Sequence, residues 1–406
     1  TALLRRGFGV RLPVGVLFEM QFSFIKFSVF LFSFLSVAFT QCESSSDMNR
    51  ALQVVIIFLS FVACNKDDLD VPIQENGNLT FISAVDISRF PEIANLNPTF
   101  YDLEGNQNDL LTILKDNGVN TVRLKLWVDP SDEYAGFNVV KQFSKTLKVN
   151  GFKTWLTLHY SDTWADPGHQ ETPNQWQGIN FMQLKDSVYN YTEKIAAELQ
   201  PDFIQIGNEI NSGFLHPYGH ILNNFQQFRE LLETAIVAMR TTSSETKIIL
   251  HFAGIEGADW FFDQLSIVDY DIIGLSYYPI WHGKSLNNLR AKMQYLGNDH
   301  QKKILIAETA YPFTLDWNDW TNNIVGTDEQ LILPEFPATA KGQRKFINKI
   351  KLLTKEVDNG IGFCYWGAEL IAWKGNESQD ASTWENQALF DFDNKALPVL
   401  REFKNE

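Results

Sequence analysis

The amino-acid sequence predicts an α/β protein, a (β/α)8 TIM barrel that forms a single domain over residues 80–406. Eight short β-rich runs alternate with longer stretches of helical period. Several of these runs, such as residues 248–250, are apolar without alternation, which is typical of strands covered on both faces. Strands that alternate with helices pair in parallel through right-handed crossovers, and eight such units close a barrel. An open doubly wound sheet is the alternative, but no glycine fingerprint follows the first run.

The elements are expected in a regular order along the chain, strand and helix in turn. The expected strands are residues 81–86, 121–127, 154–159, 203–207, 247–252, 272–276, 303–307 and 362–366. The expected helices are residues 108–117, 139–149, 181–198, 224–239, 259–265, 286–295, 342–356 and 397–403.

The sequence before residue 80 has a different character. Residues 48–63 begin with a short basic start, continue as an apolar segment and stop before Cys64, so they resemble a lipoprotein signal peptide. Cys64 is the expected lipidated residue, and residues 64–79 are expected to form a flexible acidic tether. Residues 1–47 are interpreted as an upstream extension from an over-long gene model, with an N-terminal membrane helix as the alternative. We therefore expect a secreted, outer-membrane or cell-surface lipoprotein whose lipid is its only membrane contact.

Composition narrows the classes of partner. The formal net charge is -15 and the pI is about 5.0. Binding a phosphate backbone requires clustered Lys and Arg, and this acidic sequence has no such cluster. A nucleic acid is therefore not the expected partner, and an uncharged polymer is the better one.

The three cysteines, Cys42, Cys64 and Cys364, are too few for a disulfide framework. The sequence also has no His/Cys cluster with zinc spacing and no phosphate-binding glycine loop.

Two glutamates each stand where an apolar run ends. Glu209 follows residues 203–208, and Glu308 follows residues 304–307. A strand that buries apolar residues and then presents a carboxylate places a functional group at one rim of the sheet. Hydrolysis of a sugar linkage needs two carboxylates, one to protonate the leaving oxygen and one to attack or stabilise the sugar cation. A lone glutamate at a strand end is more often an ion-pair partner, but two at one mouth favour catalysis.

Other strand ends bring polar and aromatic side chains to the same mouth, namely Asp86, Arg123, Trp127, His159, His251, Tyr277 and Trp366. Arg123 is expected to hold Glu308 ionised, because a nearby cation lowers the pKa of a carboxylate. Glu209 would need a raised pKa to act as an acid. Asn208 has an amide suited to a sugar hydroxyl.

Six segments carry a family resemblance: residues 86–88, 121–127, 159–167, 205–210, 276–283 and 308–312. They resemble the arabinogalactan endo-β-1,4-galactanases of glycoside hydrolase family 53, most specifically at residues 159–167. The resemblance implies that Glu209 is the general acid/base and Glu308 the nucleophile, acting with retention through a covalent galactosyl-enzyme. It also implies that Asn208 binds the 2-hydroxyl and that Tyr277 and Arg123 orient Glu308.

The expected substrate-binding residues are Asp86, Arg123, His159, Asp162, Trp164, Asp166, Asn208, Tyr277, His282, Trp366 and Trp384. Their hydrogen-bonding groups would meet galactose hydroxyls, and the Trp rings, with that of Trp373, would stack on sugar faces. Packing within a loop remains the alternative for each Trp. For His159 the alternative is a hydrogen-bonded residue at a strand end.

The expected function is that of an endo-acting β-1,4-galactanase, a monomer that cuts type I arabinogalactan or pectic galactan. Another retaining barrel glycanase, such as a mannanase or xylanase, is one alternative, and a non-catalytic glycan-binding lipoprotein is another. The resemblance also raises a structural calcium ion near residues 316–322. Because their spacing is not that of an EF-hand and Trp interrupts it, no metal or cofactor is expected.

Overall fold

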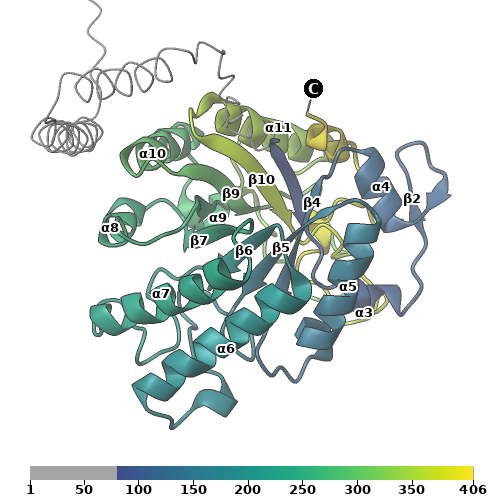
Figure 1. The fold of residues 1–406 in the computed structure, drawn as a ribbon. Coiled ribbons are helices and arrows are strands. Elements are labelled where there is room, and N and C mark those ends of the chain that lie inside the picture. Colours follow the sequence, from purple (N-terminus) through teal and green to yellow (C-terminus); the bar gives the residue numbers. More distant parts are fainter. Residues whose placement is uncertain (1–79, 406) are drawn as a thin grey trace, which may run out of the picture. The chain divides into compact units, whose positions relative to one another are not determined.

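The computed structural model describes residues 80–405, which form a closed barrel of eight parallel strands ringed by helices (Figure 1). The ring follows chain order and closes where the first strand pairs with the last. The strands are β1 (Ile82–Asp86), β4 (Thr121–Leu126), β5 (Lys153–Leu158), β6 (Phe203–Ile206), β7 (Lys247–Ala253), β8 (Ile272–Ser276), β9 (Lys303–Thr309) and β10 (Gly360–Trp366). The predicted (β/α)8 barrel is confirmed, and the open doubly wound sheet is wrong.

Seven helices of the described chain match predicted ones to within a few residues. They are α4 (Leu110–Asp116), α5 (Phe137–Val149), α6 (Phe181–Leu199), α7 (Phe225–Thr242), α8 (Ala258–Gln264), α10 (Leu286–Asp299) and α11 (Ala340–Glu356). The expected helix at residues 397–403 is instead the 3-10 helix η5 (Pro398–Phe403). The short helices α3 (Phe90–Ala94) and α9 (Pro279–His282), and the hairpin of β2 (Phe100–Tyr101) and β3 (Gln107–Asn108), were not predicted. Segments this short show no clear period.

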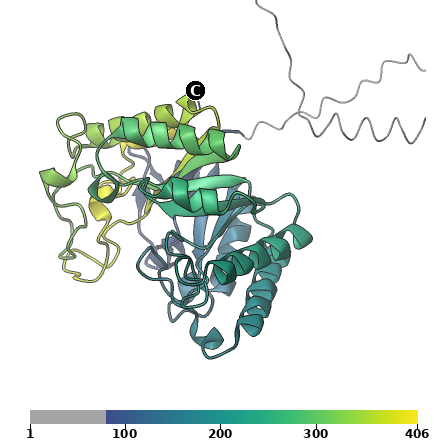
Figure 2. The same ribbon diagram turned by 90° about the vertical axis from the view of Figure 1, so that its left-hand side faces the viewer.

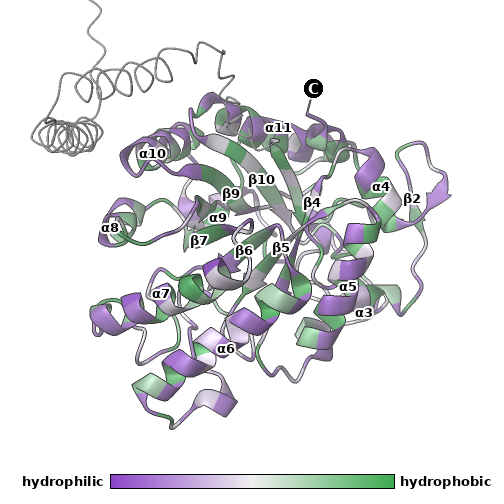
Figure 3. Cartoon of the chain, viewed as in Figure 1, coloured by the Kyte–Doolittle hydropathy of each residue, from purple (hydrophilic) through white to green (hydrophobic). Residues whose placement is uncertain are grey.

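Local signals explain where the long helices begin. Asn180 and Gln183 form a reciprocal capping box at the start of α6, each side chain accepting from the other residue's backbone N–H at 3.0 Å. Thr339 caps α11 by accepting from the Gly342 N–H at 3.0 Å. Figure 3 shows the consequence for packing: hydrophobic residues concentrate on the strands, while the helices carry hydrophilic residues among the hydrophobic ones.

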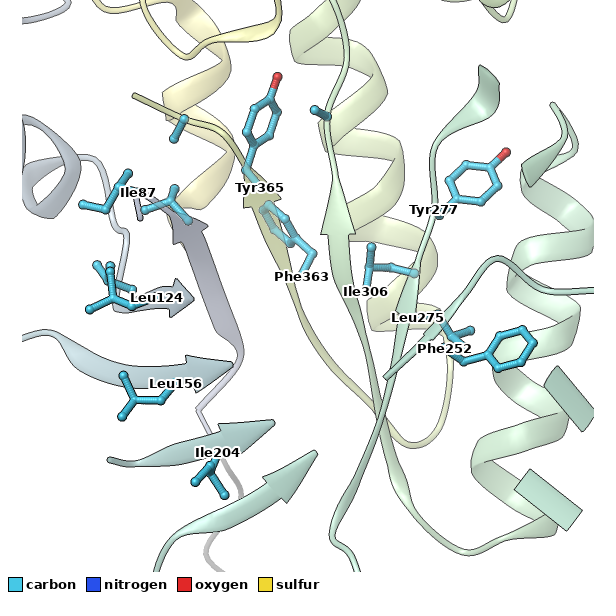
Figure 4. Close-up of a cluster of buried hydrophobic side chains, with 14 of the residues drawn as sticks. Ile87, Leu124, Leu156, Ile204, Phe252, Leu275, Tyr277, Ile306, Phe363 and Tyr365 are labelled. Atoms are coloured by element: carbon cyan, nitrogen blue, oxygen red, sulfur yellow. The ribbon is translucent and has the colours of Figure 1, made fainter. Parts of the chain in front are cut away.

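The apolar core has two layers. The larger lies between strands and helices and includes Leu124, Leu156 and Ile306 (Figure 4). The smaller is a separate cluster that includes Trp155 and Phe203. Because side chains alternate along a strand, these two sets face opposite sides of the sheet, and the smaller one fills the barrel interior.

On several strands, the interior-facing residue that lies two positions after an apolar one is polar. Ala84 is followed by Asp86 on β1, Phe203 by Gln205 on β6, and Ile249 by His251 on β7, all of them buried. The period of two places each polar residue directly above an apolar one on the same face. The carboxyl end of the barrel is therefore a buried polar layer supported by an apolar floor.

Two long segments lie side by side at this end of the molecule, one after β9 and one after β10 (Figure 2). Backbone hydrogen bonds join them, from Phe313 N–H to Asn386 O at 2.9 Å and from Ile324 N–H to Thr383 O at 3.0 Å. They form one continuous rim instead of two independent loops.

The predicted boundaries at residues 47, 63 and 79, and the predicted lipidation of Cys64, lie outside the described residues. Within residues 80–405, no helix is both long and apolar enough to span a membrane.

Candidate active site

Glu209 reaches the mouth through an unusual backbone turn directly after β6. Gly207 has a φ of +76°, and a Cβ there would lie 2.4 Å from Ile210 Cγ2, so only glycine fits. Glu209 itself has a φ of +47°, which non-glycine residues rarely adopt. The surrounding packing must hold this strained conformation, as is common at functional sites.

Glu308 is aimed by an irregularity in β9. Leu275 of β8 pairs with Ile306, but the next residue, Ser276, pairs with Glu308, so Ala307 is an extra residue. A β-bulge of this kind re-aims the side chains beside it. Ala307 belongs to the apolar cluster of the interior, and Glu308, its neighbour, still reaches the polar layer.

The buried guanidinium of Arg123 connects the residues of this layer. Its Nη1 donates to Asp86 Oδ2 at 2.9 Å, and its Nη2 donates to Asn208 Oδ1 at 2.8 Å and to Glu308 Oε1 at 2.7 Å. Burial alone would lower the pKa of Arg123, but the charges of Glu308 and Asp86 outweigh it and raise that pKa. Arg123 is therefore a permanent cation that holds one oxygen of Glu308.

The second oxygen of Glu308 is held by Tyr278, not by the predicted Tyr277. The Tyr278 hydroxyl donates to Glu308 Oε2 at 3.1 Å. Tyr277 is fully buried in the layer between strands and helices (Figure 4), and its hydroxyl donates to Gly283 O at 2.7 Å. The prediction was off by one residue because successive side chains of an extended segment point to opposite faces.

Glu209 is held by a different chain of hydrogen bonds. The Ser276 hydroxyl donates to Glu209 Oε1 at 2.5 Å, and His251 Nε2 lies 2.9 Å from Ser276 Oγ. His251 Nδ1 accepts from Gln205 Nε2 at 2.9 Å and from the Glu209 N–H at 3.3 Å, so Nε2 carries the ring hydrogen. Burial and the Arg123 charge lower the pKa of His251, which keeps the ring neutral.

The two carboxyls differ in electrostatic environment. Burial and the charge of Glu308 raise the pKa of Glu209 to about 8. Burial also raises the pKa of Glu308, but the direct contacts with Arg123 and Tyr278 oppose that rise. Glu308 therefore ionises first, and Glu209 keeps a proton at neutral pH. This is the division of labour required of a nucleophile and a general acid.

The two carboxyls also lie close enough to act on one bond. An oxygen of Glu209, an oxygen of Glu308 and a ring nitrogen of His251 all lie within 4.8 Å of one another. Such a set could in principle bind a metal ion. However, both ring nitrogens of His251 have hydrogen-bond partners, and Arg123 holds a Glu308 oxygen. The geometry suits acid–base chemistry better than metal binding.

Three predicted substrate-binding residues make contacts within the protein. Asp162 accepts from the backbone N–H of Asp129 and Asn174, one on each oxygen, so it joins two loops. Asp166 is half exposed and accepts from the Gly168 N–H. His159 Nδ1 accepts from Trp127 Nε1 and from the Ala165 N–H.

The predicted tryptophans gather at the rim, from the segment after β5 and from the end of β10 and the segment after it. Trp164 is partly exposed, with its ring 5.8 Å from that of Trp366. Trp384 is buried, 4.8 Å from Trp366 and edge-on to it. His282 Nδ1 accepts from the Tyr278 N–H at 3.0 Å, and burial lowers the pKa of His282 to about 4. Of the predicted residues, Asp86, Arg123, Asn208, Glu209 and Glu308 thus form one network, with the tryptophans beside it.

The sequence led us to expect no metal, but the rim segments after β9 and β10 contain oxygen atoms suited to calcium. Asp319 Oδ2, Asn323 Oδ1 and Glu385 Oε2 are buried and have no hydrogen-bond partner among the described residues. Glu385 lies against both Asp319 and Asn323. Carboxylate and amide oxygens are the ligands that calcium prefers. These three residues would hold the ion, which would tie the two segments together.

Sequence reasoning missed Ser276, Tyr278 and Gln205 and did not assign a role to His251. Alternation was the available signal, because Gly274, Ser276 and Tyr278 share one face of β8 and its extension. The contact between Ser276 and Glu209 spans 67 residues of sequence and has no local signature.

A closed parallel barrel whose mouth pairs an ionised carboxylate with a protonated one defines a barrel glycoside hydrolase. The model of glycosyl hydrolase family 53 matches residues 82–403, and the chain belongs to this family.

Curated relatives and a solved structure agree with the family. The arabinogalactan endo-beta-1,4-galactanase of Cellvibrio japonicus (strain Ueda107) is 35% identical over 352 residues, covering 80% of this chain and 91% of that protein. The endo-beta-1,4-galactanase of Bacillus subtilis (strain 168) is 30% identical over 388 residues, covering 83% and 89%. The structure of the GH53 catalytic domain of Ignisphaera aggregans has a TM-score of 0.75 and 38% identity, covering 80% of this chain and 96% of that one.

The two adjacent tyrosines allow a matched test. Tyr278→Phe should move the acidic limb of the pH–activity profile to higher pH, because Glu308 loses a hydrogen bond that lowers its pKa. Tyr277→Phe should leave the limb in place. The measurement is kcat/KM against pH for both variants, and equal shifts in the two would contradict the assignment.

Calcium at the rim can be tested by its removal. EDTA should lower the melting temperature by a few degrees, and added calcium should restore it, because an ion that binds only the folded state stabilises that state. Asp319→Asn should abolish the response, whereas Asp316→Asn, an exposed change in the same segment, should preserve it. An EDTA-insensitive wild-type melting curve would count against a bound ion.

Proposed function

We propose that this protein is an endo-acting β-1,4-galactanase that cleaves internal linkages of type I arabinogalactan or pectic galactan. Its membership of family 53 and the galactanases among its relatives support the linkage and the substrate. The observation that carries the mechanism is the closeness of the two carboxyls, because one oxygen of Glu209 lies within 4.8 Å of one oxygen of Glu308.

This separation favours retention of the anomeric configuration. Retaining glycosidases hold their carboxyls about 5–5.5 Å apart, whereas inverting enzymes need roughly 6.5–9.5 Å to admit a water molecule between one carboxylate and the sugar. One oxygen of Glu209 lies within 4.8 Å of one oxygen of Glu308, which is nearer to the retaining arrangement. Glu308 is therefore close enough to attack the sugar directly.

The reaction proceeds in two displacements. A Glu308 oxygen attacks the anomeric carbon, the bond to the leaving sugar breaks, and Glu209 gives its proton to the leaving oxygen. Ser276 donates to Glu209 Oε1, so the transferable proton resides on Oε2. Ionised Glu209 then takes a proton from water, the water oxygen attacks the same carbon, and the bond to Glu308 breaks. The product keeps the β configuration.

Arg123 and Asn208 support both displacements. Arg123 orients the Glu308 carboxylate while Tyr278 fixes its other oxygen. One amide hydrogen of Asn208 goes to Ala165 O at 2.8 Å, and its oxygen accepts from Arg123. The second amide hydrogen is available for the sugar hydroxyl beside the scissile bond.

The choice of substrate is tested with potato-type galactan, mannan and xylan. Of the three glycans, only galactan should be cleaved. Its viscosity should fall quickly while reducing ends appear slowly, because internal cuts shorten chains before small products accumulate. Sizing the products over time would show oligosaccharides first. Preferential cleavage of mannan or xylan would transfer the assignment to another retaining glycanase.

The catalytic pair is tested by isosteric substitution. Glu209→Gln should lower kcat on galactan by roughly 10²- to 10⁴-fold, the usual contribution of a general acid, and Glu308→Gln should lower it further. Glu256→Gln, an exposed change after β7, should retain activity. NMR of the first products should show the β anomer, and an initial α anomer would exclude retention.

We also propose that Cys64 carries a lipid that tethers a monomeric enzyme to the cell surface. The apolar segment that ends before Cys64 and the acidic stretch after it support this arrangement. The residues of the catalytic network described above all come from one barrel, which supports a monomeric enzyme. Light scattering of the soluble domain would test the monomer.

The anchor has a direct test in a host that processes lipoproteins. The wild type should incorporate labelled palmitate and remain with membranes, whereas Cys64→Ser should be unlabelled and should no longer be retained by a lipid. Cys42→Ser should behave as the wild type, since it lies upstream of the cleavage point. A mature N-terminus ahead of Cys64, measured by intact mass, would refute the anchor.

A further inference from the structure

A second group of metal-binding side chains lies where the neighbouring helices α8 and α10 end (Figure 1). Asp263 is in the last turn of α8, Asp299 is the last residue of α10, and His300 follows it. A carboxylate oxygen of each Asp and a ring nitrogen of His300 all lie within 4.8 Å of one another. Strand β9 begins just beyond, at Lys303, so this rear cluster lies at the amino end of the barrel, opposite the mouth.

His300 brings a buried nitrogen without a partner to this cluster. Its side chain is 5% exposed, and its ring packs against the fully buried Phe262, with 6.2 Å between the ring centres. Nε2 has no hydrogen-bond partner among residues 80–405. It lies 3.6 Å from Asp263 Oδ1, which is longer than the roughly 2.7–3.2 Å of a hydrogen bond. The ring nitrogen therefore faces a carboxylate without bonding to it.

This spacing suits a metal ion placed between the two side chains. Zinc binds imidazole nitrogen and carboxylate oxygen at about 2.0–2.2 Å in a tetrahedron, so two of its ligands lie roughly 3.3–3.6 Å apart. The 3.6 Å between His300 Nε2 and Asp263 Oδ1 matches that distance. Asp263 is half exposed and Asp299 is exposed, so both carboxylates can adjust and an ion can enter between them. Water would supply the fourth ligand.

The local charges also favour a cation. Helices α8 and α10 each have an Asp and no basic residue in the last turn. The last turn of a helix carries partial negative charge, so an acidic side chain there is unfavourable unless a cation compensates it. Lys292 of α10 does not do so, because its Nζ pairs with Asp259 at 3.1 Å, one turn earlier on α8. The negative potential raises the pKa of Tyr295, chiefly through the charge of Asp299 and also through Asp263.

We propose that Asp263, Asp299 and His300 form a binding site for a divalent transition-metal ion, and that zinc is the ion that fits it best. Imidazole is a common ligand of zinc, whereas calcium prefers oxygen ligands alone, so this site differs in selectivity from the calcium residues of the rim. The bound ion links the ends of α8 and α10. Because the rear cluster lies opposite the mouth, the ion contributes to the stability of the barrel and takes no part in the reaction.

The test is the addition of zinc chloride to the protein in excess calcium, which keeps the rim residues occupied. Isothermal titration calorimetry should show saturable zinc binding, and the melting temperature should rise by a few degrees, because the ion binds only the folded state. His300→Gln and Asp263→Asn each remove one ligand. Each should weaken zinc binding by at least about tenfold and abolish the rise, since even residues that only support a metal ligand contribute that much.

The matched control is Asp259→Asn, which removes a carboxylate of the same helix that is already paired with Lys292. It should bind zinc as the wild type does. Anomalous X-ray scattering from zinc-soaked crystals should place the ion beside His300 Nε2. No saturable binding, binding that survives Asp263→Asn, an equal loss in Asp259→Asn, or an ion found only beside Glu209 would overturn the site. Asp263 is half exposed, so its variant should fold even if His300→Gln does not.

Discussion

The arrangement of the mouth depends on one buried cation. Arg123 has five N–H donors in a rigid fork, and the structure uses them to align Asp86, Asn208 and Glu308, which belong to three separate parts of the barrel. Burying a guanidinium is costly unless it is paired and hydrogen-bonded. Here the carboxylates that compensate the charge are themselves parts of the site. The same contacts of Arg123 therefore both stabilise the interior and orient the nucleophile Glu308.

The same layer separates the two carboxyls by environment. Glu308 has a cation and a phenol on its oxygens, whereas Glu209 has a serine that is itself held by a neutral histidine. Two glutamates, with one oxygen of each within 4.8 Å of the other's, thus take opposite protonation states. Both residues are glutamates, so residue type does not distinguish their protonation states. The difference comes from the side chains that neighbouring strands place beside each carboxyl.

Most of the barrel and the core of the site could be predicted from the sequence. Strand order followed from alternation with helices, and polar residues that interrupt apolar runs pointed to Asp86, Glu209 and Glu308 at or near strand ends and to Arg123 within β4. The prediction named Tyr277 in place of Tyr278 because it did not apply the alternation of side chains beyond the end of β8. That alternation directs Tyr278, not Tyr277, toward Glu308. Partners such as Ser276 could not be predicted, because their contacts join residues far apart in sequence. The role of Asp162 was hidden for the same reason, since it joins loops whose course the sequence does not determine.

The extra residue Ala307 links catalysis to the assembly of the sheet. Since the offset between β8 and β9 changes at that point, the nucleophile occupies its place only when both strands are in register on either side of it. A slip by one position would turn the carboxylate out of the cavity while preserving most of the backbone pairing. Turnover is therefore a sensitive reporter of correct barrel closure in this protein. A misaligned barrel could retain the spectroscopic signature of its secondary structure and yet be inert.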